Sequence, residues 1–134
     1  MIISVDFVSE MPIYMQIYEQ IVRAISNGNL APGESLPSVR RLSDDIGINI
    51  HTVNKAYAIL RDEGYLKMSR RSGATVVMSM PDKSLVLPSI SDRLRQLSAQ
   101  AAVHGISQAE FTKMAEEAYQ DVVSKKDAGE QKDG

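Results

Sequence analysis

The chain has 134 residues, enough for one compact domain and an appendage. It contains no cysteine, which excludes disulfides and thiolate metal sites and suits a reducing cytoplasm. The formal net charge of −2 is not the basic balance expected of a nucleic-acid-binding domain, so any contact with an anion must depend on local clusters of Lys and Arg.

The N-terminal part is expected to form a short strand followed by a helix. Residues 2–7 alternate weakly between apolar and polar, which favours a strand. They lack the basic and apolar runs of a signal peptide or membrane anchor, so a cytoplasmic protein without membrane association is expected. Pro12 is placed like the first residue of a helix, and Asn27-Gly28 like its end. Apolar residues between them recur at helical spacing and predict one buried face: Tyr14, Ile17, Tyr18, Ile21, Val22 and Ile25.

Residues 36–66 contain two short helices separated by a glycine. Ser38 can cap the first helix, and Gly47 ends it after the apolar residues Val39, Leu42 and Ile46. Asn49 can cap the second helix, which ends at Gly64. The residues that this second helix is expected to bury are Val53, Ala56, Tyr57 and Leu60.

Two helices joined by a tight, glycine-containing turn are typical of a helix-turn-helix. In that motif the first helix braces against the DNA backbone, and the N-terminal residues of the second meet base edges in the major groove. The polar start of the second helix fits this role, so the expected contacts are Asn49, Ile50, His51, Thr52, Asn54 and Lys55. The alternative is an ordinary helix-loop-helix piece of an α-rich domain, most of which do not touch DNA.

A β-hairpin is predicted directly after the second helix. Two β-prone runs, residues 65–69 and 74–78, flank the sequence RRSG. A hairpin in this position is a wing, and Arg70 and Arg71 at its tip could reach phosphates or a minor groove. The alternative is a solvated tip whose arginines only favour solubility.

The C-terminal part is expected to form two helices after a linker bracketed by Pro81 and Pro88. The first helix starts near Ser89, and a capping box, Ser107 to Glu110, opens the second. Together they carry more apolar surface than two helices can cover, which predicts a dimerisation tail; the alternative is a tail folded back on its own winged domain. The expected dimerisation residues are Ile90, Leu94, Leu97, Ala101, Phe111, Met114, Ala118, Tyr119 and Val122.

No enzyme, cofactor or metal site is predicted. The two histidines, His51 and His104, belong to different elements, and no metalloprotease or P-loop motif is present. The adjacent carboxylate pairs, Asp44-Asp45 and Glu116-Glu117, point to different faces of their helices and so do not converge on one site.

The chain resembles the GntR superfamily of bacterial transcription regulators from Pro12 to about Val77. The matching segments, in order, are PIYMQI, GNLAPGESLPSVRRLS, TVNKAYAILRDEGYL and SGATVV. The resemblance implies a winged helix-turn-helix that binds palindromic operators as a dimer, with repression as the family's habit. It also implies DNA contacts by Arg40, Asn49, His51, Thr52, Asn54, Arg70 and Gly73; Ser38 and Arg41 adjoin Arg40 and are included in the expected interface.

Two positions depart from the family pattern, and the short tail indicates a branch. Ile50 stands where the family often has an arginine that would read guanine, although it could meet a thymine methyl. Arg71 occupies the place of the wing's first glycine. A tail of this length resembles the YtrA-type branch, whose members often sit beside transport genes.

The sequence therefore predicts a mainly α protein with a small β wing. The expected parts are a winged helix-turn-helix DNA-binding domain at 1–78, a linker at 79–88, a helical dimerisation tail at 89–125 and a disordered C-terminus at 126–134. The expected function is a homodimeric, sequence-specific regulator that binds double-stranded operator DNA. The alternative is a protein-interaction module without DNA binding. The sequence leaves any small-molecule effector unidentified.

Overall fold

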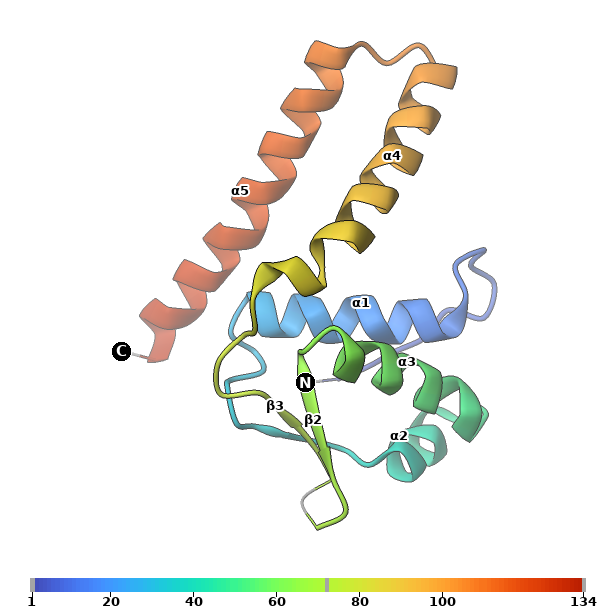
Figure 1. Cartoon of the computed structure of the whole chain (residues 1–134), viewed down its shortest axis with the longest axis vertical. Coiled ribbons are helices and arrows are strands. Elements are labelled where there is room, and N and C mark those ends of the chain that lie inside the picture. Colours follow the sequence, from blue (N-terminus) through green and yellow to red (C-terminus); the bar gives the residue numbers. More distant parts are fainter. Residues whose placement is uncertain (1, 72, 134) are drawn as a thin grey trace. The chain divides into compact units, whose positions relative to one another are not determined.

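The computed structural model describes residues 2–71 and 73–133, with side chains through residue 124. The chain divides into two compact units, Met1–Met80 and Pro81–Gly134. The first unit holds α1 (Ile13–Ser26), β1 (Ser35–Leu36), α2 (Val39–Ile46), α3 (Ile50–Asp62), β2 (Leu66–Ser69) and β3 (Gly73–Val76). The second holds a 3₁₀ helix, η1 (Lys83–Leu85), and two long helices, α4 (Leu87–Val103) and α5 (Gln108–Asp133) (Figure 1). The predicted class, mainly α with a small β wing, is confirmed.

The first unit is built around one aliphatic core. The three helices and the sheet bury the apolar faces that helical spacing predicted, and Ile17, Tyr57 and Leu60 are almost completely enclosed. The whole cluster consists of Ile17, Tyr18, Ile21, Ala24, Leu30, Leu36, Leu42, Val53, Ala56, Tyr57, Leu60, Leu66, Ala74 and Val76. This core fixes α3 against α1 and α2, which leaves the opposite side of α3 for solvent.

The joint between α2 and α3 has the caps that the sequence predicts. The Ser38 hydroxyl accepts a hydrogen bond from the Arg41 backbone N–H at 3.1 Å, and the Asn49 side chain accepts one from the His51 N–H at 2.8 Å. Gly47 ends α2 with a φ of 77°, a left-handed conformation that strains any residue with a side chain. The chain can therefore turn sharply enough to start α3 within three residues.

The sheet has three antiparallel strands in the order β1-β3-β2. Leu66 of β2 lies opposite Val76 of β3, and Ser69 lies opposite Gly73, which confirms the predicted hairpin. Strand β1 was not predicted, because a two-residue strand carries no alternation to detect; it exists through its pairing with β3.

The predicted strand at residues 2–7 is wrong. This segment has no strand partner, and side-chain amides of α1 take the place of one. Gln20 pairs with both the N–H and the carbonyl of Ser4, and Gln16 does the same with Asp6, at distances of 2.6–3.1 Å. The prediction for Pro12 also needs correction, since it is the N-cap of α1 rather than its first residue.

The second unit is longer in helix than the sequence indicated. Helix α4 begins at Leu87, so η1 and the first turn of α4 occupy part of the expected linker. The Ser107 hydroxyl accepts a hydrogen bond from the Glu110 N–H at 3.1 Å, which supplies one half of the expected capping box. Residues 126–133, expected to be disordered, continue α5, because Lys, Ala, Glu and Gln are strong helix formers even where nothing is buried; Gly134 lies outside the described residues.

Candidate nucleic-acid interface

The first turn of α2 presents two arginines to solvent. Arg41 lies 3.8 Å from the Asp45 carboxylate, a pair with both side chains well exposed that is worth little in water. Arg40 is also exposed, and within the described part of the chain it takes part in no ion pair. Arg40 is therefore the arginine of α2 whose charge is not already shared with a carboxylate.

The start of α3 carries the predicted base-reading residues on its exposed side. Asn49, His51, Asn54 and Lys55 are exposed, and Ile50 and Thr52 are half-buried. The Asn49 carbonyl oxygen is already used by the cap, so this residue has a structural role beside any contact with DNA. His51 and Asn54 are three residues apart and face the same way.

A buried hydroxyl that the sequence reasoning assigned only to the core links α3 to the segment before α2. The Tyr57 hydroxyl donates a hydrogen bond to the Pro37 carbonyl at 2.8 Å. Burial raises the pKa of Tyr57 far above its ordinary value, so the hydroxyl stays protonated and remains a donor. The sequence did contain a signal, because a tyrosine on an otherwise aliphatic helix face needs a partner for its hydroxyl. This bond fixes the entry into α2, next to Ser38.

Replacing Tyr57 with Phe keeps the ring but leaves the Pro37 carbonyl without its donor. We expect Tyr57→Phe to lower the free energy of unfolding by roughly 1–3 kcal/mol and to weaken DNA binding, because the start of α2 loses its anchor. Urea unfolding and a binding titration measure the two effects, with Tyr119→Phe on the exposed surface of α5 as the control. An unfolding midpoint equal to that of the control would show that the hydrogen bond contributes nothing.

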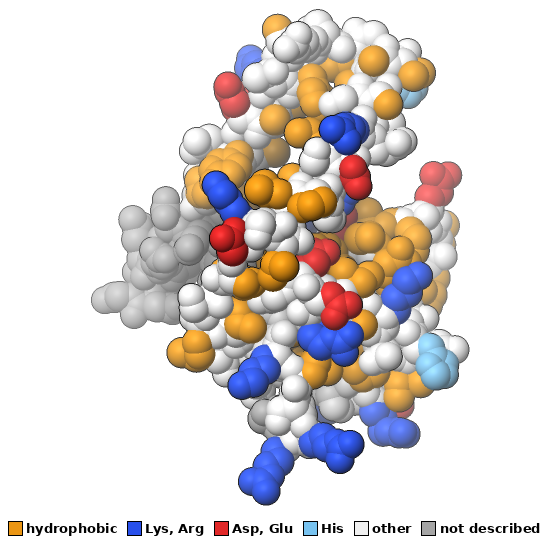
Figure 2. Space-filling model, viewed as in Figure 1, with side chains coloured by type: hydrophobic (Ala, Val, Ile, Leu, Met, Phe, Trp, Pro, Cys, Tyr) orange, Lys and Arg blue, Asp and Glu red, His pale blue; other side chains and the backbone are white. Residues whose placement is uncertain are grey.

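The hairpin tip carries the predicted wing arginines. Arg70 and Arg71 are exposed, and the Arg71 N–H donates to the Ser69 hydroxyl at 3.2 Å in a tight turn. Gly73 follows with a φ of 69°, which a glycine adopts without strain. Figure 2 shows Lys and Arg side chains projecting at the lower end of the view, around the tip of the hairpin that Figure 1 labels β2 and β3. A cationic tip is thus built on a strand pair that the core holds.

Most of the predicted dimerisation residues are exposed or half-buried. Leu94 and Leu97 of α4 are 49% and 53% exposed, and Met114 and Tyr119 of α5 are 50% and 70% exposed. The other exposed members are Ile90, Ala118 and Val122, and Phe111 is half-buried. Ala101 is the correction, because it is only 7% exposed and cannot contribute much to an accessible face.

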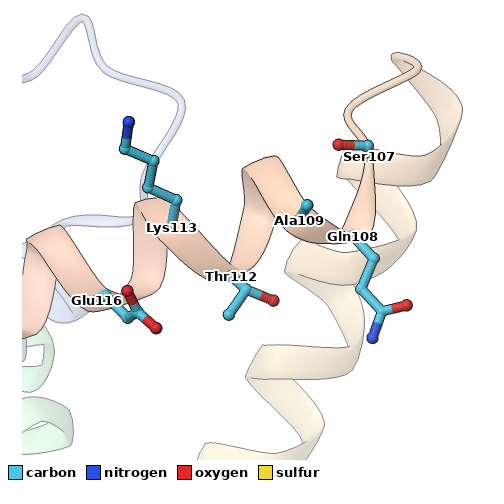
Figure 3. A pocket seen from close by; sticks show the side chains of 6 residues that line it. All are labelled: Ser107, Gln108, Ala109, Thr112, Lys113 and Glu116. Carbon is cyan, nitrogen blue, oxygen red and sulfur yellow. The ribbon is translucent and has the colours of Figure 1, made fainter.

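The described residues offer little that could hold a small ligand or a metal. They contain no group of three or more His, Cys, Asp or Glu side chains that could bind a metal ion. A hollow of about 900 Å³ lies at the start of α5. Figure 3 shows that its lining comes from that helix and the residue before it, so no opposing element closes it. Across the described residues, the helices are too short or too polar to serve as a membrane span.

Comparisons with known proteins agree with this architecture. Residues 13–76 match a family model described as bacterial regulatory proteins, gntR family. The transcriptional repressor YtrA from Bacillus subtilis is 36% identical over 107 residues, which cover 78% of this chain and 82% of YtrA. The chain belongs to the GntR family. Its relatives are transcription regulators, not enzymes.

Solved structures extend the likeness over both units of this GntR-family member. YtrA from Sulfolobus acidocaldarius, a GntR-family transcription factor, is 35% identical with a TM-score of 0.56 and aligns over 90% of this chain and 98% of its own. A Listeria monocytogenes protein described as a transcriptional antiterminator is 27% identical with a TM-score of 0.79, over 92% and 93%. By contrast, the chain spans only 16% of the pyridoxine biosynthesis regulator PdxR from Corynebacterium glutamicum, with 44% identity over 73 residues. The YtrA-type assignment is thereby confirmed.

Proposed function

We propose that this protein is a sequence-specific DNA-binding repressor that acts in the cytoplasm as a homodimer on a palindromic operator. The observation that carries the proposal is the exposed set of polar and cationic side chains on α2, α3 and the hairpin tip of a GntR-type winged unit. The name of the Bacillus subtilis relative, a transcriptional repressor, supports repression as the direction of control.

The dimer follows from what one winged unit can read. A single recognition helix meets only a few base pairs, too few to be found among the competing sites of a genome. Two units on a two-fold axis read two half-sites about one helical turn apart. The exposed apolar residues of α4 and α5 provide a surface that a second copy would cover.

Arg40 and the α3 residues are assigned different parts in this interface. Arg40 lies on the first turn of the bracing helix, so we assign it a phosphate contact, which positions the protein without reading sequence. His51 and Asn54 lie on the recognition helix and are assigned to base edges.

Substitution should separate positioning from reading. We expect Arg40→Ala to weaken binding to all duplexes alike and to reduce the salt slope by about one phosphate contact. Asn54→Ala and His51→Ala should change the preferred bases, at roughly 1–3 kcal/mol each on the preferred site. Binding measured on matched and mismatched duplexes decides this, and a uniform loss for all three variants would contradict the assignment.

Selection from a pool of random duplexes tests the function itself. The expected result is enrichment of one palindromic sequence whose half-sites are about 10 base pairs apart. Mapping that sequence onto the DNA around the native gene then identifies the regulated promoter. Failure to enrich any sequence, at low as well as moderate salt, would overturn the proposal.

A further inference from the structure

A lysine of the recognition helix is held by a tyrosine of the first helix. The Lys55 ammonium lies 4.0 Å from the centre of the Tyr14 ring. Tyr14 belongs to the first turn of α1 and is half-buried against the core, so its position is fixed. Lys55 belongs to the second turn of α3, and its side chain is otherwise exposed. Figure 1 shows the two helices adjacent within the winged unit.

This arrangement restrains the ammonium without neutralising it. A carboxylate partner, such as Asp45 beside Arg41, would cancel the charge that an anion must meet. An aromatic face attracts the cation but leaves the N–H groups on its far side available. Within the described residues, Lys55 has no ion pair and no side-chain hydrogen bond. The lysine is therefore ordered in advance and still able to bind an anion.

The position of Lys55 fits a backbone phosphate better than a base. Residues of the first turn of α3, such as His51, come first into the groove when the helix enters by its N-terminus. Lys55 lies one turn further along, on the side drawn toward α1, and a lysine binds phosphate as a point charge without bidentate geometry. We propose that Tyr14 is a positioning residue that holds Lys55 against a phosphate of the DNA backbone. This inference rests on the DNA-binding function proposed above.

The test is a double-mutant cycle on binding to a duplex that the wild-type protein has selected from a random pool. The variants are Tyr14→Leu, which removes the ring, Lys55→Ala, which removes the cation, and the double variant. Tyr14→Phe keeps the ring face, and Lys55→Arg keeps the charge. Thermal unfolding of each variant records any general loss of stability, which a merely structural role of Tyr14 would also cause.

We expect Lys55→Ala to reduce the slope of log K against log salt by about 0.9, the value for one phosphate contact. Tyr14→Leu should weaken binding by about two- to tenfold and reduce the slope in the same direction, because the ammonium is no longer held. In the Lys55→Ala background the same change should have no further effect on DNA affinity. Tyr14→Phe should bind like the wild type, and Lys55→Arg should retain the slope.

Three results would overturn the inference. Equal effects of Tyr14→Leu with and without Lys55 would mean that Tyr14 acts on the fold alone. An unchanged salt slope in Lys55→Ala would remove the phosphate contact. In both cases the wild-type protein still binds the duplex, so the proposed function stands. A wild-type protein that selects no duplex would overturn the function and this inference together.

Discussion

A chain ending at Met80 is expected to be monomeric and to bind the selected operator at least about 100-fold more weakly than the full-length protein. The first unit contains its own core and its own caps, so it should stay folded without the second. It would keep the contacts of one half-site and lose the link to the other. Because the second half-site is then no longer bound intramolecularly, avidity disappears although no contact within a half-site has changed.

The reason for placing the dimer on the second unit is its uncovered apolar surface. Leu87, Ile90, Leu94 and Leu97 follow helical spacing along α4, and each is about half exposed. Figure 1 shows α4 and α5 diverging from the turn that joins them, so the pair does not enclose these side chains by itself. An apolar stripe of this length on a regulator indicates a partner surface, and a second copy matches the two-fold axis of a palindrome.

A full-length variant separates dimerisation from deletion. Leu94→Glu together with Leu97→Glu places two charges on the exposed stripe and should give a monomer with the same loss of affinity. The matched control, Gln108→Glu with Thr112→Glu, adds the same charges to an exposed polar part of α5 and should remain dimeric. Light scattering at micromolar concentration measures the mass. A dimeric Met80 truncation, or a monomeric full-length protein, would contradict the account.

Removing both wing arginines is expected to produce the largest loss among substitutions in the winged unit. Arg70→Ala with Arg71→Ala should reduce the salt slope by about 1.8, twice the value for one phosphate contact, and should weaken binding most at low salt. The fold should be unaffected, because both side chains are exposed at a turn.

The control for the wing is removal of two exposed cations elsewhere. Arg93→Ala with Arg95→Ala in α4 makes the same change in net charge but lies in the other unit. If both double variants lost affinity equally, the effect would be one of total charge and the wing would not belong to the interface. If neither lost affinity, the hairpin tip would be a solvated turn.

The sequence predicted the elements that depend on local chemistry. The caps of Ser38 and Asn49 and the left-handed Gly47 follow from what one residue does to the backbone beside it. The buried faces of α1 and α3 follow from helical spacing. These features placed the recognition helix and the wing before any tertiary contact was known.

The features that the sequence did not predict depend on contacts between distant residues. The segment at residues 2–7 has the alternation of a strand, but the amides of Gln16 and Gln20 satisfy its backbone instead of a neighbouring strand. Similarly, nothing local to Tyr57 or Lys55 reveals that one bonds to Pro37 and the other lies over the ring of Tyr14. Burial of Ala101 also depends on packing that spacing alone does not give.

The most direct test of the account is the salt dependence of DNA binding by the full-length protein. Fluorescence anisotropy with the selected duplex gives the affinity at each salt concentration. A dimer that neutralises about six or more phosphates should lose about 10³-fold or more in affinity between about 50 and 200 mM salt. A protein-interaction module would show no saturable binding to the duplex, or an affinity that does not change with salt, and either result would contradict the account.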